Sequence, residues 1–158
     1  MKQNKILPSG RRLLQMLSLF LVLALMLPGA AFAASADDVV GTWLTVGGKS
    51  KVQISKVGGK YVGKLVWLKD PKRNGKDKTD LQNPNKSLQG RKLMGLSLLD
   101  GFTYSGGKWV NGTIYNPLDG KTYSCELTLQ AGGKQLNVRG YVLGMTALGK
   151  TQVWTATK

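Results

Sequence analysis

The sequence has no histidine, a single cysteine and only eight acidic residues among its 158 positions. Without histidine it lacks the commonest general base and the commonest metal ligand of proteins. Its one cysteine, Cys125, has no internal partner for a disulfide and alternates with apolar residues, which predicts a buried, unreactive thiol. No paired catalytic carboxylates are evident, and no serine lies in a nucleophile-elbow pattern. The sequence therefore predicts no cofactor and no metal site, and a hydrolase-type enzyme is the least favoured class of function.

The N-terminus has the pattern of a secretory signal peptide. Four basic residues among the first twelve precede an apolar run over residues 13–27, which ends at Pro28. The small residues that follow fit cleavage after Ala33, with a second option after Ala36. A membrane anchor is the alternative, but a spanning helix needs roughly 20 apolar residues and this run is shorter. We therefore expect residues 1–33 to be a cleaved signal peptide. Residues 34–158 then form one periplasmic or secreted domain of bacterial type, without a transmembrane span.

The expected mature chain is strongly basic. The leader contains four of the 23 basic residues and none of the eight acidic ones, which leaves a net charge of +11. Such a charge favours anionic partners of the cell envelope, such as phospholipid head groups or acidic polymers. Nucleic acid would also be attracted, but export argues against it as a partner. The alternative is that the lysines only solvate strand edges and turns.

Glycine pairs separate segments that are rich in β-branched and aromatic residues. Such pairs supply the positive φ angles of tight hairpins, and their regular spacing suits a meander of antiparallel strands. Only residues 88–99 could form a short helix. The expected strands are residues 41–46, 51–57, 60–68, 102–105, 108–116, 121–130, 134–143 and 150–157.

Eight antiparallel strands of this length predict an all-β fold, an up-and-down barrel that closes on itself. A flattened sandwich is the competing architecture. Residues 69–92 interrupt the rhythm as a long loop between strands 3 and 4, with eight basic and three acidic residues. The loop does not match a calcium site that starts at Asp70, because Lys72 and Leu81 stand where carboxylates are required. It is either a lid or contact surface, or a plain solvated insertion.

Aromatic side chains concentrate in the expected strands, where they suit either ordinary packing or the wall of a ligand pocket. Arg139 and Tyr141 share one strand face, so Arg139 could hold an anionic head group if that face points inward. Arg91 and the loop would lie at the mouth of the barrel. The predicted ligand-binding residues are Trp67, Arg91, Tyr115, Tyr123, Arg139, Tyr141 and Trp154.

Two sets of motifs carry a family resemblance. Gly41-Thr42-Trp43 at the start of the first strand resembles the lipocalin signature, in which the Trp plugs the closed end of the barrel. Gly112–Tyr123, together with the segments 63–68, 80–84, 91–96, 138–141 and 149–154, resembles the exported bacterial family called domain of unknown function 2147. The resemblance implies a lipocalin-like barrel with a ligand-binding role, and it carries no established reaction.

These observations lead to two main hypotheses. The first is an exported barrel that binds a small amphipathic or anionic ligand. The second is a basic module without a ligand cavity, which uses its loop on the anionic envelope or on a partner protein. Salt-sensitive binding that depends on the loop lysines would favour the second.

Overall fold

The structure is a computed structural model that describes residues 34–130, 132–142 and 145–157. The expected signal peptide, residues 1–33, lies outside these described residues. Within the described ranges, no helix has the length and hydropathy needed to cross a membrane. The elements are β1 (Gly41–Leu44), η1 (Val46–Gly48), β2 (Ser50–Val57), β3 (Lys60–Leu68), β4 (Lys72–Arg73), β5 (Lys76–Asp77), η2 (Lys86–Leu88), β6 (Ser97–Ser105), β7 (Lys108–Asn116), β8 (Lys121–Leu129), β9 (Gln135–Val142) and β10 (Met145–Ala156).

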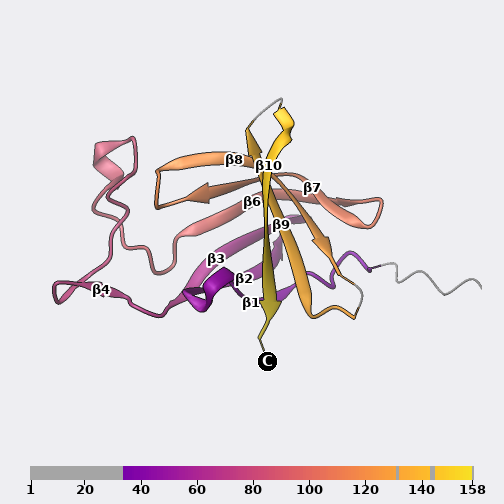
Figure 1. The fold of residues 1–158 in the computed structure, drawn as a ribbon, viewed down its shortest axis with the longest axis horizontal. Coiled ribbons are helices and arrows are strands. Elements are labelled where there is room, and N and C mark those ends of the chain that lie inside the picture. The colour runs from indigo at the N-terminus through magenta and orange to yellow at the C-terminus, as the bar shows by residue number, and fades with distance from the viewer. Residues whose placement is uncertain (1–33, 131, 143–144, 158) are drawn as a thin grey trace, which may run out of the picture. The chain divides into compact units, whose positions relative to one another are not determined.

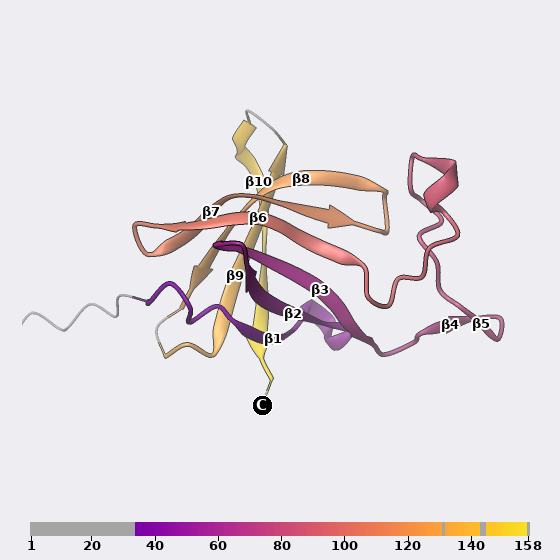
Figure 2. The ribbon, with the colours of Figure 1, turned by 180° about the vertical axis from the view of Figure 1, so that it is seen from behind.

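Eight of these strands form a closed antiparallel barrel in the order β1-β10-β9-β8-β7-β6-β3-β2 (Figure 1). Each strand pairs with its sequence neighbour among the eight, and β1 closes the ring on β10 through the pairs Trp43–Ala156 and Leu44–Thr155. The prediction of an all-β up-and-down barrel is confirmed, and the sandwich alternative is not formed. The short hairpin β4–β5 lies within the long connection from β3 to β6, away from the barrel strands (Figure 2).

The fourth barrel strand is longer than expected, and the short helix that the sequence allowed over residues 88–99 does not form. Leucines at 93, 96 and 99 imitate a helical period, but Gly90 and Gly95 oppose a helix and β6 already begins at Ser97. Within β6, Gly101 adopts a φ of 77° and breaks the strand alternation. As a result both Leu99 and Phe102 are buried, although they are three residues apart. A prediction that assumes strict alternation of inward and outward side chains therefore identifies only the second half of this strand.

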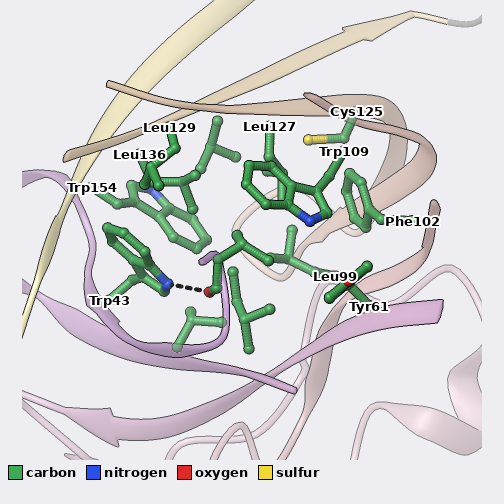
Figure 3. Close-up of a cluster of buried hydrophobic side chains, with 14 of the residues drawn as sticks. Trp43, Tyr61, Leu99, Phe102, Trp109, Cys125, Leu127, Leu129, Leu136 and Trp154 are labelled. Atoms are coloured by element: carbon green, nitrogen blue, oxygen red, sulfur yellow. Dashed lines mark hydrogen bonds between the residues drawn. The ribbon is translucent and has the colours of Figure 1, made fainter. Parts of the chain in front are cut away.

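The inward face of the barrel is apolar and closely packed at one end (Figure 3). Trp109, Phe102 and Leu127 are fully buried there. Gly112 lies against the Phe102 ring so closely that an added Cβ would stand 2.3 Å from a ring atom. A glycine in β7 therefore makes room for a large aromatic side chain from the neighbouring strand.

The chain segment before β1 closes this end of the barrel. We call residues 34–40 the N-terminal plug. The Trp43 indole nitrogen donates to the Val39 carbonyl at 2.9 Å, and the Trp109 indole nitrogen donates to the Ala36 carbonyl at 2.9 Å. Both indoles therefore bury their bulk while their N–H groups are satisfied. The expected position of Trp43 at the closed end is confirmed.

Two tyrosines tie the same plug to the barrel from β3 and β6. The Tyr104 hydroxyl donates to the Ala34 carbonyl. The Tyr61 hydroxyl donates to Asp37 Oδ1 at 2.6 Å, and the Lys56 ammonium group lies 2.8 Å from the same oxygen. Hydrogen bonds to backbone carbonyls and to one carboxylate therefore hold the plug in place. The side chain of Val39 is also fully buried and adds apolar packing.

Candidate functional site

The opposite end of the barrel opens into a cavity of about 960 Å³. Because consecutive strands run antiparallel, the connections β1–β2, β3–β6, β7–β8 and β9–β10 all lie at this end. Residues from the β1–β2, β3–β6 and β7–β8 connections line the cavity, together with Val142 of β9 and Leu148 of β10. We call this end the mouth, and the end with the plug the closed end.

The deeper wall of the cavity is apolar. Its residues come from five barrel strands and from the segment just before β6, so the cavity depends on the closed fold rather than on one segment. The apolar wall consists of Leu65, Leu68, Leu93, Leu98, Ile114, Val138 and Trp154, with Tyr123 beside them. Such a wall suits an apolar ligand body.

A glycine on β9, which has no side chain, helps to keep this space open. Gly140 lines the cavity, and a Cβ built on it would contact only Ile114 Cγ2 at 3.5 Å and Tyr123 Cβ at 3.8 Å. These are ordinary van der Waals distances, so an alanine fits without displacing a neighbour. A longer side chain at this position would extend into the cavity.

The lining residues nearer the mouth carry more positive than negative charge. Lys49, Arg73, Lys78 and Lys150 line the cavity there, against Asp70 and Asp119. One of the two carboxylates already accepts a hydrogen bond, because the Tyr123 hydroxyl donates to Asp119 Oδ2 at 2.7 Å. Burial alone would raise the pKa of Asp119, but this hydrogen bond and the backbone N–H of residue 121 hold it below its usual value. The mouth therefore favours an anionic group.

The long loop is fixed beside the mouth by a buried carboxylate. Asp80 is fully buried and accepts four contacts: Tyr115 Oη to Oδ1 at 2.7 Å, and Asn83 Nδ2, Arg91 Nε and an Arg91 terminal nitrogen to Oδ2 at 2.9, 2.9 and 2.8 Å. Asn83 Nδ2 also lies 3.0 Å from the Tyr115 hydroxyl. This network joins the loop to the outer face of β7.

The charge state of Asp80 follows from these contacts. Burial by itself raises the pKa of Asp80, but the hydrogen bonds from Tyr115, Asn83 and Arg91 outweigh it and hold the pKa below its ordinary value. Burial and the hydrogen bond to the carboxylate raise the pKa of Tyr115. The Arg91 guanidinium lies 5.4 Å from the centre of the Tyr115 ring, which adds a cation–π contact. Asp80 therefore stays ionised and Tyr115 stays protonated at neutral pH.

The loop also contacts the β7–β8 turn through its main chain. Gly120 has a φ of 71°, and a Cβ added there would lie 1.9 Å from the Gln82 carbonyl oxygen. Only glycine suits both the conformation and the close approach. The loop is therefore not a plain solvated insertion, since side-chain and main-chain contacts fix it at the mouth.

The structure brings four of the seven predicted site residues together. Tyr115, Tyr123, Tyr141 and Trp154 are all lining residues, but Tyr115 and Tyr141 belong to the outer faces of β7 and β9, so only Tyr123 and Trp154 come from inward strand faces. Trp67, Arg91 and Arg139 are not among its lining residues.

The three remaining residues have other surroundings. Trp67 is exposed and lies beneath the Lys51 ammonium group, 5.5 Å from the ring centre. Arg91 pairs with Asp80. Arg139 lies on the outer face of β9 and donates to the Thr146 carbonyl at 2.6 Å, because the buried residues of this strand belong to the opposite set. The idea that the Arg139 face points inward is therefore corrected.

Several cavity residues were not singled out from the sequence. Val138 and Gly140 alternate with Arg139, so the period of β9 could have identified them once the inward face was known. Leu93 lies between the long loop and β6, where no periodicity predicts its contact with the cavity.

The single cysteine does not belong to the cavity. Cys125 is fully buried, and burial, with a smaller contribution from Glu126, raises the pKa of its thiol to about 12. The expectation of a buried, unreactive thiol agrees with this environment.

Comparisons with known proteins match both the sequence and the fold. Residues 41–156 match a family model described as "Uncharacterized protein conserved in bacteria (DUF2147)". A similar solved structure is protein HP1028 from the human pathogen Helicobacter pylori, described as belonging to the lipocalin family. The two chains are 26% identical, and the match has a TM-score of 0.66 and covers 76% of this chain and 83% of the other. No curated protein matches the chain.

Proposed function

Since the chain belongs to the uncharacterized bacterial family DUF2147 and folds as a lipocalin-like barrel, we propose that it binds a small amphipathic ligand with an anionic head group. The observation that carries this proposal is the cavity of about 960 Å³ at the mouth. Eight-stranded barrels can hold one small ligand, as lipocalins do, and this volume lies in the range of small-molecule sites.

The distribution of side chains suggests how the ligand is oriented. The apolar wall around Ile114, Val138 and Trp154 receives the apolar body. The head group stays near the mouth, where Arg73, Lys78 and Lys150 supply positive charge. An anion there gains Coulomb energy and remains hydrated, so it does not incur the full cost of burial.

A substitution that fills the cavity tests this proposal. Gly140→Leu places a branched side chain in the space that the ligand would occupy. With the fluorescent fatty acid 11-(dansylamino)undecanoic acid as probe, we expect its affinity to fall about tenfold or more. The unfolding temperature of the variant should stay equal or rise, because the new side chain gains apolar contacts without a backbone clash.

The matched control is Gly140→Ala, whose Cβ meets its neighbours at van der Waals distance and should leave binding unchanged. The methyl ester of the same probe should bind more weakly than the free acid, because it lacks the charge. Binding that survives Gly140→Leu, or that Gly140→Ala reduces equally, would contradict the cavity as the binding site.

We also propose that the chain is exported to the periplasm or beyond and is cleaved after Ala33. The plug supports this site over the alternative after Ala36, because the carbonyls of Ala34 and Ala36 accept hydrogen bonds from Tyr104 and Trp109. Cleavage after Ala36 would remove both acceptors. We expect intact-mass measurement of the exported protein to give a chain that starts at Ala34. A chain that starts at Asp37, or a full-length chain in the cytoplasm, would refute this.

A further inference from the structure

Large apolar side chains are exposed around the mouth of the barrel. Leu118 in the β7–β8 turn is 85% exposed, Leu148 near the β9–β10 connection 70%, and Val46 between β1 and β2 56%. Leu81 in the long loop and Val142 at the end of β9 are also exposed. All five line the cavity entrance, so they surround one opening. We call these five residues the apolar rim.

The closed end lacks a comparable set. Its β2–β3 and β6–β7 turns are the glycine pairs Gly58-Gly59 and Gly106-Gly107. Among the described residues, the large apolar side chains exposed on that half of the barrel are Val40, Val57 and Val153, which do not surround an opening. Exposed apolar surface is therefore concentrated where the cavity opens, which is the pattern of an interaction site rather than of scattered surface residues.

The long loop places positive charge beside the apolar rim. Two of its basic residues are neutralised in ion pairs, Arg91 with Asp80 and Lys92 with Asp77. Within the described part of the chain, the loop's other basic residues form no salt bridge: Lys69, Lys72, Arg73, Lys76, Lys78 and Lys86. Asp70 is the remaining acidic residue of the loop, so the loop presents a net positive charge next to the opening.

We propose that the mouth docks on an anionic phospholipid membrane, with the apolar rim inserted at the interface and the loop lysines against the head groups. Exposed apolar side chains flanked by lysine and arginine bind anionic membranes in this way. The rim residues come from three connections and from the strands β9 and β10 around an opening, which suits a deformable lipid surface better than the groove of a partner protein. Docking at this end would let an amphipathic ligand pass between bilayer and cavity without crossing water.

Vesicle flotation tests this docking surface. The mature protein is mixed with phosphatidylcholine vesicles that contain or lack phosphatidylglycerol. We expect binding to the anionic vesicles, little binding to the neutral ones, and a loss of binding as salt is raised. Leu118→Asp combined with Leu148→Asp should weaken binding about tenfold or more, as should Lys72→Glu combined with Arg73→Glu.

Matched variants at the closed end separate docking from general charge or apolar effects. Val57→Asp changes a side chain that is 61% exposed, and Lys60→Glu with Lys108→Glu reverses two exposed charges there. Both should keep vesicle binding, and circular dichroism should show every variant folded. The proposal would be overturned if the closed-end variants lost vesicle binding as much as the mouth variants do, or if the protein bound neutral vesicles as well as anionic ones. Capture of an acidic protein without any vesicle binding would also overturn it. Gly140→Leu should still bind vesicles, so cavity binding and docking can fail independently.

Discussion

Replacing Asp80 by leucine is expected to lower the free energy of unfolding by about 3 kcal/mol and to release the long loop from β7. Asp80 is fully buried and is the common acceptor for Tyr115, Asn83 and Arg91. Leucine accepts nothing, so a tyrosine hydroxyl, an amide and a guanidinium lose their partner together. Arg91 is partly exposed and can regain water, which keeps the loss below that of a fully buried ion pair. Urea unfolding gives the free energy, and limited proteolysis reports the release of residues 69–92.

Two controls locate this effect in the network. Tyr115→Phe removes one hydroxyl and should cost about 1 kcal/mol. Asp100→Asn changes an exposed carboxylate of β6 and should have little effect. If Asp80→Leu unfolds no more easily than Asp100→Asn, the network does not hold the loop.

The same carboxylate makes the loop sensitive to acid. The pKa of Asp80 is lower in the folded protein than in the unfolded chain, so its contribution is complete above the unfolded value of about 4. As the pH falls below about 4 toward the folded pKa, protonation removes that contribution. The loop should therefore stay in place at neutral and mildly acidic pH, and the wild-type advantage over Asp80→Asn should shrink only in stronger acid.

Replacing Trp109 by alanine is expected to cost about 3–5 kcal/mol, the usual loss for a large aromatic side chain in a core. Trp109 is fully buried, packs at 83° against the Tyr61 ring with centroids 6.3 Å apart, and donates to the Ala36 carbonyl. Alanine leaves a cavity and also frees one anchor of the N-terminal plug. Thermal and urea unfolding measure the cost, and proteolysis near residue 40 measures the freedom of the plug.

Trp109→Phe keeps much of the volume and loses the N–H donor, so it should fall between wild type and Trp109→Ala. Trp67→Ala is the matched control, because that indole is 39% exposed on the outer side of β3. We expect it to cost less than half as much as Trp109→Ala. Similar losses at the two positions would mean that the closed end is not a stability centre.

The barrel could be predicted from the sequence because its strands obey local rules. In β9 the alternation of Leu136 and Val138 with Asn137 and Arg139 fixes two faces, and glycine pairs mark the turns. Strict alternation does not hold in β6, where Gly101 with its positive φ creates a bulge and puts Leu99 and Phe102 on one side. A pattern that assumes strict alternation cannot detect a bulge.

The candidate site was less predictable than the fold. Aromatic strand residues such as Tyr123 and Trp154 were found from their type and position, and they line the cavity. Arg91 was placed at the mouth for its charge, but its partner Asp80 lies eleven residues earlier in a loop. No local pattern joins two such residues to a tyrosine of β7. A role for Arg139 in the cavity depended on its strand face pointing inward, and the alternation in β9 separates two faces without stating which one is inside.

Barrel closure makes the two ends of the domain depend on each other. Residues 43 and 44 pair with residues 156 and 155, so the first strand finds its second partner only when the last strand is present. A chain whose synthesis stops a dozen residues early would keep free edges on β1 and β9, the kind of edge that recruits other chains. Such long-range pairing raises contact order and slows folding, so these edges stay unpaired until the C-terminal strand has been made.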